Sequence, residues 1–124
     1  MTDFKSIPII DETQYEQLML LDEGTFELMH ELLGIWKTTA SEVYEQVQKA
    51  IDANDLTVIE KLGHKMKGSC SNIAFGRLSN VWAQIESAAK EGSFEKVTSL
   101  FEASKEFYEE SRISMEKRTT KTAA

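Results

Sequence analysis

The sequence lacks the features that a disulfide-stapled, exported or membrane-spanning protein needs. Its one cysteine, Cys70, cannot pair within the chain, and no apolar run approaches the roughly 18–20 residues that cross a bilayer. The amino terminus, MTDFKSIPII, has no basic region followed by an apolar stretch, so it does not resemble a secretory signal. We therefore expect a cytoplasmic protein, in which thiols stay reduced.

Proline and glycine are also scarce. One proline and six glycines interrupt 124 residues, and no strand-like alternation persists, so helices should dominate. The length suits one domain, and 41% hydrophobic with 28% charged residues is the composition of an ordinary globular protein. We treat residues 1–124 as a single domain, with segment 1–10 and tail 118–124 expected to be flexible. The start at Met1 favours a free-standing protein.

Basic residues are fewer than acidic residues, and the formal net charge is −7. A surface of that sign repels phosphate backbones and anionic lipids, so neither nucleic acid nor a membrane is an expected partner. Solubility alone would also explain this acidity. No metal site is expected, because His30 and His64 fall on different predicted helices and Cys70 faces the core.

Apolar residues recur at steps of three and four in four segments, which predicts four amphipathic helices. Their predicted core positions are Phe26, Met29, Leu33, Trp36, Ala40, Val43, Val47 and Ile51; Ile59, Leu62, Met66, Cys70 and Ile73; Leu78, Val81, Trp82, Ile85 and Ala89; and Phe94, Val97, Phe101 and Tyr108. Breaks are predicted at 53–55, 74–76 and 92–93, with Ser93 as a cap. Asp11 and Gln14 resemble a capping box that opens a shorter helix. The predicted fold is all-α, an antiparallel up-and-down four-helix bundle with an additional short N-terminal helix.

The second long helix carries a distinctive outer face. At about 100° per residue, His64 lies about 200° from the core positions Leu62 and Met66, so it points to solvent. The residues within about 60° of it are Glu60, Lys67, Gly68 and Ser71. A glycine in an exposed helix costs roughly 1 kcal/mol relative to alanine. Close approach of another protein's backbone to His64 would explain its presence.

This arrangement suits phosphoryl transfer. A neutral imidazole can attack an acyl phosphate, and a lysine one turn away can offset the incoming negative charge. The plainer interpretation is an ordinary surface histidine beside a solubilising lysine. A kinase is not expected, because the chain has no glycine-rich phosphate loop and no room for an ATP-binding domain.

The motif His64-Lys65-Met66-Lys67-Gly68-Ser69, followed by Asn72-Ile73 and Arg77-Leu78, resembles the histidine-containing phosphotransfer (HPt) domain family over residues 25–117. The resemblance implies that His64 is the phosphoacceptor and Lys67 the phosphate-stabilising lysine. It also implies that Gly68 lies under a docked receiver domain and that Glu86 reaches toward His64. Ala74 stands where the family commonly has Gly, and Gly63 where it commonly has Ala.

The function implied is that of a phosphoryl carrier, not an enzyme, which takes a phosphoryl group from a receiver-domain aspartate and passes it to another receiver. Expected partners are response-regulator receivers and a hybrid sensor histidine kinase. No cofactor is expected, since the Mg²⁺ belongs to the receiver, and we expect a monomer. The docking surface is predicted to include Glu60, Ser71 and Phe75, with Leu18 or Met19 from the first helix. The alternative is a helical binding module that docks a receiver or regulator without accepting phosphate.

Overall fold

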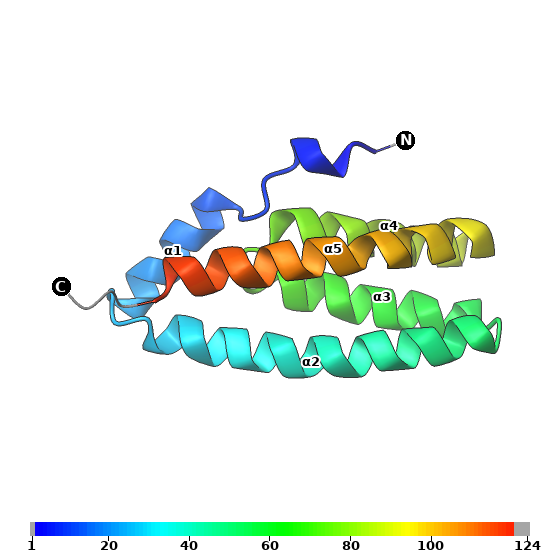
Figure 1. Ribbon diagram of the computed structural model, residues 1–124, viewed down its shortest axis with the longest axis horizontal. Coiled ribbons are helices and arrows are strands. Elements are labelled where there is room, and N and C mark those ends of the chain that lie inside the picture. Colours follow the sequence, from blue (N-terminus) through cyan, green and yellow to red (C-terminus); the bar gives the residue numbers. More distant parts are fainter. Residues whose placement is uncertain (1, 121–124) are drawn as a thin grey trace.

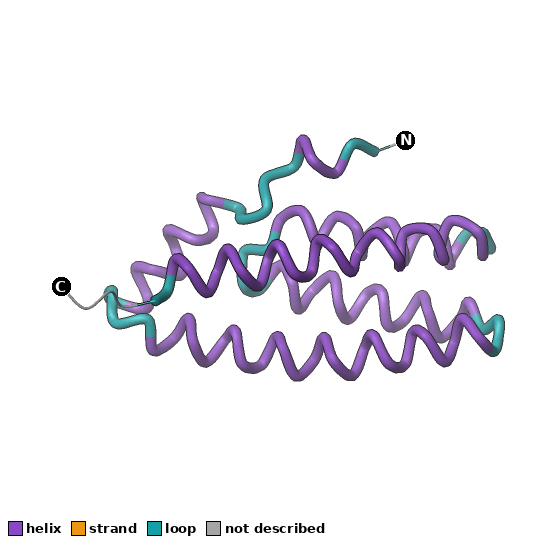
Figure 2. Tube along the Cα trace, in the orientation of Figure 1, coloured by secondary structure: helices purple, strands orange, loops and turns teal. Residues whose placement is uncertain are grey.

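The computed structural model describes residues 2–120 and is all-helical over that range. After a short 3₁₀ helix (Phe4–Ser6) come α1 (Glu12–Asp22), α2 (Glu27–Asp52), α3 (Leu56–Ser71), α4 (Gly76–Lys90) and α5 (Phe94–Arg118). Helices α2 to α5 run alongside one another along the long axis of the molecule, and α1 lies at one end of this bundle (Figure 1). The connections between the bundle helices are short (Figure 2). The predicted fold class, a four-helix bundle with an added N-terminal helix, is confirmed.

Capping interactions set where the helices begin and end. The side chain of Asp11 accepts from the Gln14 amide at the start of α1, and Asp55 does the same for Val58 at the start of α3, each at 3.2 Å. The Gln14 side chain, however, donates to the carbonyl of Ser71, so only half of the predicted capping box forms. Ser93 is the N-cap of α5 but makes no side-chain capping bond, contrary to expectation.

The core positions predicted in α3 and α4 are all buried. In α2 and α5 the pattern is less complete, because four predicted members are only half-buried: Phe26, Ile51, Phe94 and Tyr108. The sequence pattern also missed the buried C-terminal half of α5, including Phe107 and Met115. Trp36 stacks on Tyr108 with ring centroids 4.6 Å apart, which links α2 to α5.

The N-terminal segment, expected to be flexible, packs against the bundle over residues 2–10. Phe4 meets Phe107 edge-on at 5.9 Å, and Arg77 donates to the carbonyls of Ile7 at 2.8 Å and Lys5 at 3.0 Å. At the other end, α5 continues to Arg118, and Thr119 is buried. The last four residues of the predicted flexible tail, 121–124, lie outside the described residues.

The turn between α3 and α4 contains a strained alanine. Ala74 has φ of 64°, in the left-handed region that costs an L-residue roughly 1–2 kcal/mol. We expect Ala74→Gly to stabilise the fold by up to about 1 kcal/mol, because glycine adopts this conformation without the Cβ penalty. The measurement is the free energy of unfolding from urea titrations. Ala40→Gly, in the buried middle of α2, is the matched control and should destabilise. Destabilisation by both changes would contradict the strain argument.

Candidate functional site

His64 is held on the outer face of α3 by the burial of its neighbours. Leu62 and Met66 point into the core, and the His64 side chain between them is 71% exposed. The helical register therefore places the imidazole where the sequence predicted, with a ring nitrogen accessible to a partner molecule.

Glu86, from α4, connects His64 to Lys67. Its Oε2 lies 2.8 Å from Nδ1 of His64, and its Oε1 accepts from Nζ of Lys67 at 2.9 Å. The hydrogen bond from Lys67 and then the one from His64 lower the pKa of Glu86, against the opposing effect of desolvation. The carboxylate is ionised and can only accept, so the proton of a neutral His64 sits on Nδ1. That leaves the lone pair of Nε2 free.

Two glycines of α3 have opposite surroundings, one tightly packed and one open. A Cβ on Gly63 would lie 3.1 Å from the backbone nitrogen of Glu86 and 3.2 Å from its Cα, so the missing side chain lets α4 approach closely. A Cβ on Gly68 would meet nothing within 4 Å. Gly63 therefore brings the Glu86 backbone near His64, and Gly68 leaves the surface beside His64 open.

Adding a methyl group at Gly63 should cost stability. We expect Gly63→Ala to lower the free energy of unfolding, because the nearest atoms belong to the α4 backbone and cannot rotate away. The helix-propensity gain of roughly 1 kcal/mol would only partly offset this clash. Gly34→Ala is the matched control: a Cβ there meets nothing within 4 Å, and we expect stabilisation. Equal stabilisation of both variants in urea titrations would contradict the close packing.

The other predicted site residues divide into surface and core positions. Glu60 is half-buried, and Ser71 is exposed with its hydroxyl 2.7 Å from that of Ser79. Leu18 and Met19 are half-buried on α1. Phe75 requires a correction: its side chain is fully buried and meets Trp36 edge-on at 4.7 Å. The helix ends at Ser71, so extrapolating its register to Phe75 was wrong.

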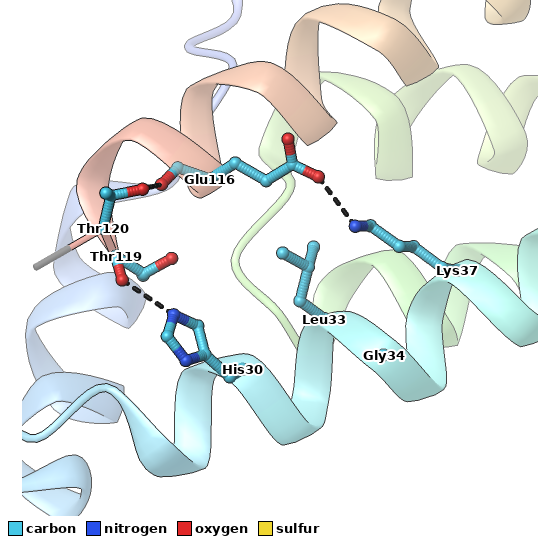
Figure 3. Close-up of a pocket in the computed structure, with 7 residues that line it drawn as sticks. All are labelled: His30, Leu33, Gly34, Lys37, Glu116, Thr119 and Thr120. Carbon is cyan, nitrogen blue, oxygen red and sulfur yellow. Dashed lines mark hydrogen bonds and ion pairs between the residues drawn. The ribbon is translucent and has the colours of Figure 1, made fainter.

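His30 lies in a separate hollow between α2 and the end of α5 (Figure 3). Its Nε2 donates to the carbonyl of Thr119 at 2.7 Å, and Lys37 pairs with Glu116 at 2.7 Å (Figure 3). These contacts join the N-terminal part of α2 to the carboxyl end of α5. Among residues 2–120 no carboxylate pairs with His30, in contrast to His64, so its arrangement is that of a structural contact.

The structure of residues 2–120 gives no support for a metal site or for a membrane-spanning helix. No three His, Cys, Asp or Glu side chains gather there in a way that could hold a metal ion. Over the same residues, no helix is both long enough and apolar enough to cross a membrane.

The sequence of residues 31–113 matches the family model described as "Hpt domain". The chain belongs to the Hpt domain family. This range contains α3, α4 and the whole His64–Glu86–Lys67 cluster. Comparison with curated protein sequences gives no match.

Solved structures show the same fold. The histidine-containing phosphotransfer protein B (HptB) of Pseudomonas aeruginosa aligns with a TM-score of 0.80 at 20% identity, covering 90% of this Hpt domain chain and 95% of HptB. Ypd1 of Saccharomyces cerevisiae, in a co-crystal with the receiver domain of its downstream response regulator Ssk1, gives 0.83 at 17% identity, covering 90% and 94%. A putative histidine-containing phosphotransfer protein from rice gives 0.72 at 14% identity, covering 90% and 86%.

Proposed function

We propose that this Hpt domain carries a phosphoryl group on Nε2 of His64 within a multistep phosphorelay. The observation that carries the proposal is the shared carboxylate of Glu86. It fixes the His64 proton on Nδ1 and holds the Lys67 ammonium one turn away, on the same side of α3. An exposed nucleophilic nitrogen with an adjacent cation is what acceptance of a phosphoryl group requires.

The transfer step follows from this geometry. The Nε2 lone pair attacks the phosphorus of an aspartyl phosphate, and the bond from phosphorus to the aspartate oxygen breaks. The electron pair of that bond leaves with the aspartate, which becomes a carboxylate. Lys67 offsets part of the charge on the phosphoryl oxygens. The reverse reaction, with a second receiver, discharges His64.

The partner that fits this surface is a response-regulator receiver domain. The open face at Gly68 leaves room for another protein's backbone beside the imidazole. Ypd1, which shares the fold, has been crystallised with a receiver domain. Transfer would use Mg²⁺ bound in the receiver, and a carrier of this kind needs no ATP-binding site of its own.

Phosphotransfer from a charged receiver tests the proposal. Candidate receivers are phosphorylated with labelled acetyl phosphate, freed of excess reagent and incubated with the protein. We expect label to move to this chain as an acid-labile, base-stable adduct that peptide mass spectrometry places on His64. A receiver that forms a stable complex without any transfer would instead support the binding module.

Substitution of Gly68 should affect thermal stability and receiver docking in opposite directions. We expect Gly68→Gln to melt at or above the wild-type temperature, because glycine is the poorer helix former and a Cβ at this position meets no described atom within 4 Å. The same side chain should slow phosphotransfer several-fold by obstructing approach to His64. Transfer rates from one receiver and thermal melts are the measurements. A variant that is more stable and transfers at the wild-type rate would remove Gly68 from the docking surface.

A further inference from the structure

Glu86 accepts hydrogen bonds from two donors through two separate oxygens, and a glutamine of the same shape has only one such oxygen. A carboxylate has two acceptor oxygens, one used by His64 and the other by Lys67. A glutamine has a single acceptor oxygen and would have to turn its NH₂ group toward one of the two residues. The Glu86 side chain is 22% exposed, against 71% for His64, so its charge acts in a partly sheltered position.

Phosphorylation would change the charge balance around this carboxylate. In the free protein, Lys67 and Glu86 neutralise one another across 2.9 Å. A phosphoryl group adds close to two negative charges to the same face. Lys67 has three N–H donors and can contact the phosphoryl oxygens as well as Glu86, but its single positive charge is then shared between two anions. The carboxylate and the phosphoryl group therefore compete for one cation and repel one another.

The carboxylate also keeps the proton on the far side of the ring. If that proton stays on Nδ1 when Nε2 bonds to phosphorus, the phosphorylated ring carries a positive charge. Glu86 stabilises this charged form, because an anion accepts more strongly from a cationic N–H donor. A protonated ring is the better leaving group, since it departs as neutral imidazole when phosphorus is attacked by the next nucleophile. The close approach of α4 at Gly63 keeps the carboxylate within reach.

We propose that Glu86 is a positioning residue that makes phosphorylated His64 a ready donor. It retains the Nδ1 proton and competes with the phosphoryl group for Lys67, and both effects shorten the lifetime of the phosphohistidine. This inference rests on the proposed function and extends it to the lifetime of the phosphorylated state. The site passes its phosphoryl group on quickly and does not store it.

The test compares phosphohistidine lifetimes. The wild-type chain, Glu86→Gln and Glu95→Gln are charged by a phosphorylated receiver, separated from it and followed as the label decays at neutral pH. We expect the Glu86→Gln phosphohistidine to last roughly three- to tenfold longer, the effect of one charge about 4 Å away that is screened by water. Glu95→Gln makes the same charge change at an exposed position in the first turn of α5 and should decay like wild type.

A second measurement needs no phosphate. Nitrogen NMR of His64 should show the proton on Nδ1 in the wild-type chain and a mixture of both ring forms in Glu86→Gln. Labelled wild type and Glu86→Gln with equal lifetimes would overturn this inference and leave the proposed function standing. A wild-type chain that accepts no label would overturn both. If Glu86→Gln accepts no label, the NMR measurement alone tests the inference. A His64 proton that remains on Nδ1 in this variant would overturn it.

Discussion

His64→Gln should accept no phosphoryl group from any receiver that charges the wild-type chain. Glutamine has no ring nitrogen with a nucleophilic lone pair, so a loss of at least a thousandfold in labelling rate is expected, in line with removal of a reacting group (roughly 10³-fold or more). The fold should be unaffected. His64 is 71% exposed and, among the described residues, its side chain hydrogen-bonds to Glu86 alone, so the free energy of unfolding should change by less than about 1 kcal/mol.

Labelling kinetics together with urea titrations check both parts of this prediction. His30→Gln is the matched control, because it removes the other histidine of the chain, whose Nε2 is occupied by the Thr119 carbonyl. That variant should be labelled at the wild-type rate. Label that persists in His64→Gln and disappears in His30→Gln would identify His30, in the first turn of α2, as the acceptor.

Phe75→Ala should lower the free energy of unfolding by about 3–5 kcal/mol, the usual cost of removing a buried phenylalanine ring. Phe75 is fully buried and packs against Trp36 across the bundle. A domain of this size is stable by about 5–15 kcal/mol, so the variant should still be folded at low temperature. Under those conditions its affinity for a receiver should match that of wild type, because no part of the Phe75 ring reaches the surface.

Chemical denaturation and receiver binding below the melting transition are the two measurements. Phe94→Ala provides the comparison, since Phe94 is a half-buried phenylalanine at the start of α5 and its removal should cost markedly less. If Phe75→Ala kept wild-type stability and lost receiver binding, the earlier placement of Phe75 on the docking surface would be right and its buried position wrong.

The turn at residues 72–76 explains why Phe75 was misplaced. Periodicity is informative only while the helix continues, and α3 ends at Ser71. Beyond it, Ala74 adopts a left-handed conformation, and the Phe75 amide bonds back to the carbonyl of Cys70 at 3.0 Å. This change in chain direction places the Phe75 side chain in the core. An alanine gives no local signal for such a conformation, which glycine or asparagine would have given.

The capping pair at α1 shows a similar limit. Asp11 caps the helix as its position predicts, because that hydrogen bond spans only three residues. Gln14 was predicted to bond back to the same turn, but the structure brings the carbonyl of Ser71 within its reach. The choice between these two partners, a backbone amide of the same turn and a distant carbonyl, depends on how α1 lies against the end of α3, and no local pattern contains that information.

The sequence by itself determined the helices, the buried faces of α3 and α4, and the outward direction of His64. All of these depend on residues within a turn or two of one another, which obey the 3.6-residue period. Tertiary structure decided how the site is connected. Glu86 and His64 are 22 residues apart, and their contact depends on α4 packing closely on α3 at Gly63. The sharing of one carboxylate between His64 and Lys67 is therefore a property of helix packing, because the distance between two helices is set by the side chains at their interface.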